Sequence, residues 1–425
     1  MPRKKSEPKT TKKKSDDDFL KELVSETGGS IMSEVGASKY FIDTGNLALN
    51  RICSGKYIGG GIPGGQITEV YGPSASAKSL LGNCVLGACQ RMGGIAVYLD
   101  CERAGNPDFA KNAAKVDVDR LVTYEPISIE QVEAKIRTSI KLITKHYGVD
   151  IPKLFVWDSI SVVPTEREWK TNELPENYTA AEFKRVVGSK EKPGERARAA
   201  GDALRRLNPL LNDHNATLYV VNQTRQKIGV MFGSDETTAG GGKALPFYAS
   251  CRLRTSATKH MLDKHEVPCG VNLNFRNKKN RAFKPFGVVE GVQLFFDQGI
   301  SPLGGLLMSL KQAERIERPS PKGNWVVKEP WAGGEEVTFK ASATEGVVPE
   351  EILLKCPSLI DAESEQEVKD YLSIWEGASK LAASDLKTAS IADDNVDLVK
   401  KADVLKNLGL EDQFNSDEFT PEESE

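Results

Sequence analysis

The chain has 425 residues, enough for two or three compact units, and its 39% hydrophobic and 28% charged residues are ordinary for a soluble globular protein. Its net charge is only −3, and no apolar run reaches about 18 residues, so the sequence argues against general disorder and against a membrane span. The seven cysteines form no CxxC pair and have no histidine at zinc-ligand spacing, and the basic N-terminus lacks the apolar core of a secretory signal. We therefore expect a cytoplasmic protein with free thiols.

Charge is concentrated at the two ends of the chain. Residues 1–14 carry seven basic residues against one glutamate, and residues 411–425 carry seven acidic residues and no basic one. Because blocks of like charge repel and stay solvated, we predict a disordered basic arm over 1–15 and a disordered acidic tail over 411–425. Two interpretations remain: a basic arm for nucleic acid with an acidic tail that competes with it, or two solubilising tails.

A short helix is predicted ahead of the main domain, within an N-terminal segment over 16–50. Three aspartates from Asp16 precede apolar residues at helical spacing, from Phe19 to Val24, and Gly28 and Gly29 follow. This amphipathic helix either docks on a neighbouring subunit or packs back on its own domain.

Short apolar runs alternate with helical patterns from residue 66 onward. Strands are predicted at Gln66–Tyr71, Ile95–Asp100, Leu121–Tyr124, Leu154–Asp158, Leu218–Asn222 and Cys251–Arg254, and helices at Lys78–Met92, Ile129–Tyr147 and Ala197–Leu211. This alternation predicts an α/β core over 51–300 with a mostly parallel central sheet flanked by helices. Beyond residue 300 the elements become shorter and mixed, which indicates a small C-terminal α+β domain over 301–410.

A phosphate-binding loop follows the first of these strands. It reads Gly72, Pro73, Ser74, Ala75, Ser76, Ala77, Lys78 and Ser79, close to the pattern GxxxxGK[ST]. In such a loop the backbone N–H groups surround the phosphates, the lysine reaches the outer phosphates, and the hydroxyl of Ser79 can hold Mg²⁺. The pattern predicts ATP and Mg²⁺ as ligands, although a turn of small residues between a strand and a helix is the plainer alternative.

Ala77 stands where this pattern has glycine. If the backbone needs a positive φ there, alanine costs about 1–2 kcal/mol. If the position is already helical, alanine is harmless. The sequence leaves both possibilities open.

Polar side chains at three strand ends complete the predicted site. Asp158 ends an apolar strand, which is where P-loop ATPases place a carboxylate beside Mg²⁺. Glu102 follows another strand end and could deprotonate the attacking water, although taken alone a solvated glutamate is the more ordinary reading. Gln223 closes the strand Leu218–Asn222, where its amide could touch the γ-phosphate.

A long glycine-rich loop, about 224–243, follows Gln223. Long loops in compact domains are usually functional or disordered, and basic residues around an apolar, aromatic tip fit a binder of single-stranded DNA. A mobile lid is the alternative. The residues concerned are Arg225, Lys227, Ile228, Gly229, Val230, Met231, Phe232, Gly240 and Gly241.

The segments GPSASAKS, VYLDCE, LFVWDSIS and VVNQTRQKIGVMFGSDETTAGGGKALPFYAS, in this order, resemble the bacterial RecA recombinase family. The resemblance covers roughly residues 17–300 and suits a divergent bacterial or a bacteriophage-encoded member. It implies that Lys78, Ser79 and Asp158 hold phosphate and Mg²⁺, that Glu102 is the general base, and that Gln223 senses the γ-phosphate. Substitutions at Ala77 and Arg276 depart from the family pattern.

The resemblance also implies roles for residues with no local motif. Phe109, just after Asn106 and Pro107, stands where the family stacks an aromatic ring on adenine. Arg276 and Lys278 match the paired lysines that complete a neighbour's ATP site. Arg198 and Arg205 match basic positions at the end of a first DNA loop, about 164–198, which is longer here than usual; the loop over 224–243 would be the second.

The function implied by the resemblance is that of an ATP-dependent recombinase. Such a protein assembles as a helical homo-filament on single-stranded DNA, pairs it with homologous duplex DNA, and hydrolyses ATP in a DNA-dependent way during recombinational repair and the SOS response. The N-terminal segment would be the polymerisation element. Two alternatives remain: an ATP-gated coating protein with little hydrolysis, and another ATPase of the same fold, such as a hexameric helicase.

Overall fold

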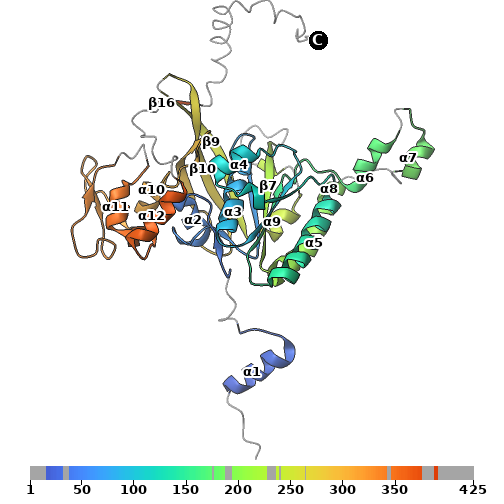
Figure 1. Ribbon diagram of the computed structural model, residues 1–425, viewed down its shortest axis with the longest axis horizontal. Coiled ribbons are helices and arrows are strands. Elements are labelled where there is room, and N and C mark those ends of the chain that lie inside the picture. Colours follow the sequence, from blue (N-terminus) through green and yellow to red (C-terminus); the bar gives the residue numbers. More distant parts are fainter. Residues whose placement is uncertain are drawn as a thin grey trace, which may run out of the picture.

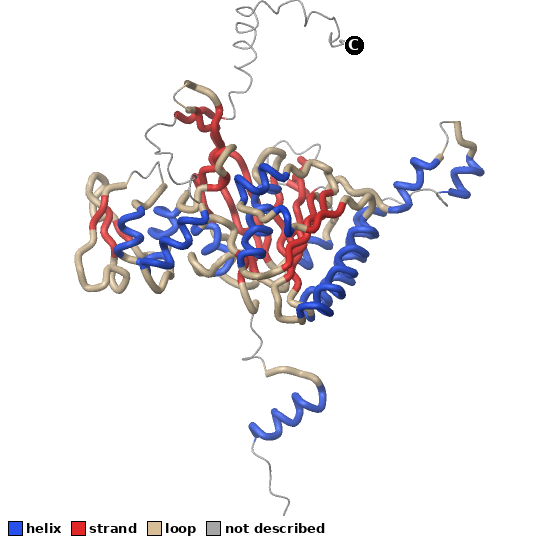
Figure 2. The backbone as a smooth tube through the Cα atoms, in the orientation of Figure 1, coloured by secondary structure: helices blue, strands red, loops and turns tan. Residues whose placement is uncertain are grey.

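The computed structural model describes residues 16–31, 38–174, 177–186, 194–226, 236–238, 241–263, 265–341, 346–375 and 387–390. Figures 1 and 2 show a body built around one large sheet with helices on both sides of it. Within the described residues, this sheet has 11 strands. None of the described helices is both long and apolar enough to span a bilayer.

Six neighbouring strands of the sheet run parallel. In spatial order they are β5 (Val122–Tyr124), β4 (Ile95–Asp100), β6 (Lys153–Asp158), β7 (Ala216–Gln226), β3 (Ile67–Gly72) and β9 (Cys251–Leu262). The sheet continues antiparallel through β10 (Pro268–Asn280), β11 (Val288–Phe295) and β12 (Gly299–Ile300). Two short strands lie beside this path: β8 (Glu236–Thr238) on β7 and β16 (Lys387–Ser390) on β9. The predicted α/β fold with a mostly parallel sheet is confirmed.

Helices cover both faces of the parallel strands. On one face, α3 (Lys78–Arg91) and α4 (Pro107–Ala114) share a hydrophobic cluster with α2 (Leu47–Ser54). On the other, α5 (Ile129–Tyr147) packs with α8 (Glu195–Asp213) and α9 (Ala244–Tyr248). Side chains of β6 alternate between the clusters, since Val156 joins the first and Phe155 and Trp157 join the second. Strands buried on both faces read as continuous apolar runs, which is why the sequence revealed them.

The antiparallel end of the sheet was not predicted. The run expected to end at Arg254 continues to Leu262 as β9 and pairs with the whole length of β10. Their outer parts are half-exposed and rich in polar residues, so they lack the apolar continuity of the parallel strands.

The C-terminal part of the described chain packs directly on the core. It contains α10 (Leu306–Gln312), α11 (Glu350–Lys355), α12 (Glu365–Ile374) and a small antiparallel sheet of β13 (Ile316–Glu317), β14 (Trp325–Val327) and β15 (Thr338–Phe339). Trp375 is fully buried in the same cluster as α2 and α3. Asp361 accepts a hydrogen bond from the backbone of Tyr57 at 2.9 Å and pairs with Arg315 at 2.6 Å.

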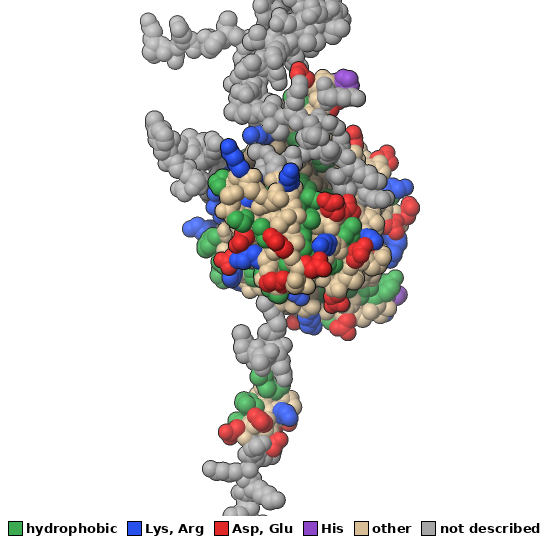
Figure 3. Space-filling model, turned by 90° about the vertical axis from the view of Figure 1, so that its left-hand side faces the viewer, with side chains coloured by type: hydrophobic (Ala, Val, Ile, Leu, Met, Phe, Trp, Pro, Cys, Tyr) green, Lys and Arg blue, Asp and Glu red, His purple; other side chains and the backbone are tan. Residues whose placement is uncertain are grey.

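The predicted N-terminal helix forms as α1 (Asp16–Thr27). None of its residues is buried: Phe19 is 56% exposed, Leu20 43% and Leu23 45%. Figure 1 shows α1 apart from the body, and Figure 3 shows apolar side chains at its surface. The described part of the chain therefore leaves the apolar face of α1 uncovered.

Candidate nucleotide site and nucleic-acid interface

The phosphate loop joins the end of β3 to the start of α3 and is tied to β9. A Cβ at Gly72 would lie 2.2 Å from the carbonyl oxygen of Thr255, so only glycine fits there. The Thr255 hydroxyl donates to the carbonyl of Ser76 at 2.7 Å, and the Ser76 hydroxyl donates to the carbonyl of Pro73 at 2.7 Å. These contacts fix the loop before any ligand arrives.

Ala77 adopts the left-handed conformation, with φ 62° and ψ 22°, immediately before α3. This geometry decides between the two possibilities for the missing glycine, because an L-residue there is strained by about 1–2 kcal/mol. Ala75 is also left-handed, with φ 55°. Left-handed residues in such a turn gather backbone N–H groups into an anion-binding concavity.

A cavity of about 390 Å³ lies against this loop. It brings together most of the predicted nucleotide residues, which come from five separate places in the chain. The predicted residues that line it are Ser74, Ala75, Ser76, Ala77, Lys78, Ser79, Glu102, Phe109, Asp158 and Gln223. Asn106 lies outside the lining and instead caps α4, where its side chain accepts the backbone N–H of Phe109 at 3.0 Å. Asn106 thereby positions Phe109.

An apolar wall of the cavity was missed from sequence. It is formed by Val271 on β10 and by Leu294 and Phe296 on or beside β11. The apolar residues alternate along these strands, but this pattern identifies the wall only once the pairing of the strands is known. Together with Phe109, the wall offers the apolar contacts that an adenine ring needs.

The polar end of the cavity is set up for a cation and phosphates. Asp158 is 3% exposed; its Oδ2 accepts from the Tyr98 hydroxyl at 3.1 Å, and its Oδ1 has no hydrogen-bond partner among the described residues. Burial raises the pKa of Asp158 to about 6, although the nearby Ser79 hydroxyl lowers it. Burial also lowers the pKa of Lys78, against the opposing effect of Asp158 and Glu102. A buried carboxylate oxygen without a partner, beside a hydroxyl and an ammonium group, fits Mg²⁺ bound with phosphate.

Glu102 lines the cavity but is itself exposed. The Ser159 hydroxyl donates to its Oε1 at 2.5 Å and so fixes the carboxylate beside the strand that carries Asp158. Ser159 was not singled out from the sequence. The arrangement leaves Glu102 accessible to water while holding its orientation, as a general base requires.

Arg276 and Lys278 do not line this cavity. They alternate on β10 with buried Phe275 and Asn277, and both are exposed. Their side chains therefore face solvent, where a second copy of the chain could meet them.

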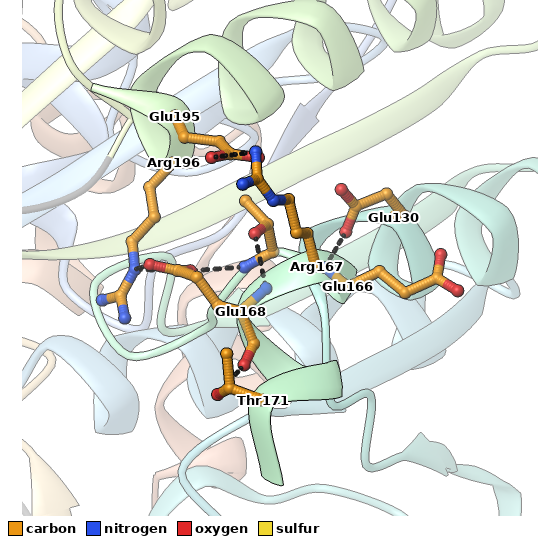
Figure 4. Close-up of polar contacts among 8 residues, drawn as sticks. Glu130, Glu166, Arg167, Glu168, Thr171, Glu195 and Arg196 are labelled. Carbon is orange, nitrogen blue, oxygen red and sulfur yellow. Dashed lines mark hydrogen bonds and ion pairs between the residues drawn. The ribbon is translucent and has the colours of Figure 1, made fainter. Parts of the chain in front are cut away.

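The base of the first predicted DNA loop is held by ion pairs (Figure 4). Thr165 and Glu168 form a capping box that starts α6 (Glu166–Trp169). Arg167 pairs with Glu195 at 3.2 Å, and Arg196 pairs with Glu168 at 2.7 Å. These pairs join α6 to the start of α8 and so close the base of an excursion that carries α7 (Ala180–Val186).

The two basic residues expected at the end of this loop lie on α8. Arg198 is exposed and lines a groove with acidic residues of α5 and α8. Arg205 is also exposed and pairs with Asp202 at 2.7 Å. Both are therefore at the surface, as a DNA contact needs.

The second predicted loop leaves from the end of β7, next to β6. β7 and β8 form its base, with Arg225 opposite Thr237. Gly241, near the other end of this loop, has a φ of 75°. A Cβ at this position would lie 3.0 Å from Cβ of Leu245 and 3.2 Å from Cδ1 of Ile160. The predicted DNA contacts Lys227, Ile228, Gly229, Val230, Met231, Phe232 and Gly240 lie outside the described residues.

A parallel α/β sheet with a phosphate loop between β3 and α3, and a buried carboxylate at the end of β6, defines a P-loop nucleotide-binding protein. A family model described as the RecA N-terminal domain matches residues 9–301. The chain is 34% identical to protein RecA of a Nocardioides species over 66% of this chain and 72% of that one. It is 31% identical to protein RecA of Thermus aquaticus over 74% and 84%, and 35% identical to that of a Caulobacter species over 67% and 70%. The chain belongs to the RecA family.

Proposed function

We propose that this protein is an ATP-dependent recombinase that forms helical filaments on single-stranded DNA and catalyses pairing and strand exchange with homologous duplex DNA. Membership of the RecA family supports a role in recombination and repair. The observation that carries the proposal is the cavity that gathers Lys78, Asp158 and Glu102 beside Gln223, the residue from which the second loop begins.

Each side chain of the cavity has a part in ATP hydrolysis under this proposal. Lys78 and the loop N–H groups hold the phosphates, Ser79 and Asp158 hold Mg²⁺, and Phe109 with the apolar wall takes the adenine ring. Mg²⁺, when bound, neutralises charge that develops on the phosphate oxygens. Glu102 orients a water and accepts its proton, while the Gln223 amide contacts the γ-phosphate.

The two loops contact the DNA backbone under this proposal. Backbone contacts carry little sequence information and depend on cations, so binding should tolerate any sequence and weaken with salt. Arg276 and Lys278 of one copy would complete the nucleotide site of the next, and α1 would link the copies into a filament.

ATP hydrolysis with and without single-stranded DNA tests the proposal directly. We expect DNA to stimulate turnover strongly in the wild type and Lys78→Ala to abolish it. Lys145→Ala, at an exposed position on α5, is the matched control and should behave as wild type. Absence of both hydrolysis and ATP-dependent DNA binding would refute the proposal.

A second candidate, an ATP-gated DNA-coating protein with little hydrolysis, is favoured by one observation. Ala77 is strained in the loop that must hold the phosphates. ATP-dependent DNA binding without phosphate release would support this candidate, and DNA-stimulated release would exclude it.

A further inference from the structure

A chain of polar contacts, buried at Glu69 and Asn222 and part-buried at its other residues, runs across strands of the sheet to the nucleotide cavity. It begins at Glu69 on β3, whose side chain is completely buried. The guanidinium of Arg252 on β9 pairs with its Oε2 from one side. From the other side, the Asn222 side-chain amide on β7 donates to its Oε1 at 2.9 Å. Glu69 therefore links the three neighbouring strands β9, β3 and β7.

The chain of contacts continues from Asn222 to the residue that faces the nucleotide. Asn222 Oδ1 accepts the Ser161 hydroxyl at 3.0 Å. The backbone N–H of Gln223 then donates to Ser161 Oγ and to Asn222 Oδ1, both at 3.0 Å. Ser161 lies between the end of β6 and the first predicted loop, and Gln223 immediately precedes the second. The network thus ends at Gln223, which lines the nucleotide cavity and adjoins the second loop.

The direction of every hydrogen bond in this network is set by Glu69. A carboxylate paired with a guanidinium can only accept, so Asn222 must turn its NH₂ toward Glu69 and its oxygen toward Ser161. That oxygen can only accept, so Ser161 must donate to it and keeps a lone pair for the Gln223 N–H. If the Asn222 amide were reversed, its NH₂ would face the Gln223 N–H, and two donors would meet at the buried Asn222 side chain.

We propose that Glu69 is a positioning residue that, through Asn222 and Ser161, fixes the backbone of Gln223 and so couples nucleotide state to DNA binding. This inference rests on the proposed function. If the hydrogen bonds of the network could reverse, nucleotide binding should persist, because Glu69 does not line the cavity. The effect of ATP on DNA binding, and of DNA on ATP binding, should weaken.

Glu69→Gln tests the inference, since it keeps shape and burial but adds a donor that lets the network reverse. We expect ATP affinity within about 3-fold of wild type, while the ATP-induced gain in affinity for single-stranded DNA falls by at least about 5-fold. DNA stimulation of ATP turnover should fall in parallel through kcat. Asp361→Asn is the matched control, because it makes the same chemical change at the partly buried pair with Arg315, far along the chain from the cavity. It should lower stability without changing the coupling.

The double variant Glu69→Gln/Asn222→Asp supplies a readout that a merely structural role would not produce. The amide introduced at position 69 could donate to the new carboxylate at position 222, which accepts from Ser161 and Gln223 as the Asn222 oxygen did, so we expect coupling to recover. Asn222→Asp alone places a second carboxylate beside Glu69 and should abolish the coupling. Wild-type coupling in Glu69→Gln, or no recovery in a folded double variant, would overturn the inference. A wild-type protein with no coupling at all would instead contradict the proposed function.

Discussion

Ala77 has a left-handed backbone conformation, which is unfavourable for a residue with a Cβ. Replacing it by glycine removes about 1–2 kcal/mol of strain from the folded state. Glycine also increases the conformational entropy of the unfolded chain, which offsets about 0.4–1 kcal/mol of this gain. We therefore expect Ala77→Gly to raise the free energy of unfolding by up to about 1.6 kcal/mol, measured by urea denaturation.

The control for this change is Ala134→Gly, at an exposed helical position of α5. It should lower stability by about 1 kcal/mol, because glycine is a poor helix former. The same sign for both variants would contradict the assignment of strain to Ala77.

Asp158 is expected to destabilise the ligand-free protein above pH 6. Its pKa is raised from 3.8 to about 6 by burial, so the folded state holds its proton more tightly than the unfolded state. The resulting stability is present below pH 3.8 and is lost as pH rises to about 6. The penalty reaches about 3 kcal/mol above that window, because each pKa unit corresponds to about 1.4 kcal/mol.

Asp158→Asn should therefore be more stable than wild type at about pH 7.5 and nearly equal to it at about pH 4. Urea denaturation at both pH values, without nucleotide or Mg²⁺, measures the difference. A constant difference across this range would show that ionisation of Asp158 is not its cause. The variant should also lose Mg²⁺-dependent ATP hydrolysis under the proposed function.

The positions of single residues at the cavity could be predicted from sequence where a local pattern marks them. Lys78 and Ser79 belong to a contiguous loop, and Asp158 ends an apolar strand, so short-range patterns sufficed. Glu69 could not be foreseen in the same way, since its role depends on partners 153 and 183 residues away. Neither could the left-handed backbone of Ala77, which the loop imposes on a residue that does not favour it.

At the scale of elements, the pattern of burial determined which helices and strands could be predicted from sequence. The parallel strands other than β9, and the helices α3, α5 and α8, were placed within a few residues, because each buries a continuous run or one regular face. The β9–β10 hairpin was missed because its outer half alternates irregularly and is stabilised by cross-strand pairing rather than by burial. The apolar wall of the cavity was missed for the same reason, because part of it lies on β10.

The uncovered face of α1 leads to a prediction at this scale. If that face docks on a second copy, Phe19→Ser/Leu23→Ser should weaken assembly at least about 10-fold, because each lost apolar contact costs about 1.5–3 kcal/mol. Sedimentation in the presence of ATP and single-stranded DNA measures the assembly.

Thermal stability of the same variant should stay at the wild-type value, because no residue of α1 is buried in the single chain. Lys21→Ser, on the same helix, is the control and should assemble normally. Assembly of the double variant at wild-type concentration would rule out this face as the contact.

At the scale of the whole molecule, residues 301–375 and the nucleotide-binding core share one hydrophobic cluster. Trp375 lies at their junction: its ring would be 2.8 Å from a Cβ at Gly45, Arg91 lies 5.5 Å from its centroid, and the neighbouring Tyr371 donates to Asp43 at 3.3 Å. A cluster shared in this way should make the two parts unfold together.

Trp375→Ala should therefore cost about 3–5 kcal/mol and lower the stability of both parts at once, because a large cavity opens in their common core. Calorimetry should show one transition whose calorimetric and van't Hoff enthalpies agree, shifted to lower temperature in the variant. Trp169→Ala on α6, where the ring is 37% exposed, is the control and should change the transition little. Two separate transitions in the wild type, with only one of them moved by Trp375→Ala, would show that the C-terminal part folds independently of the core.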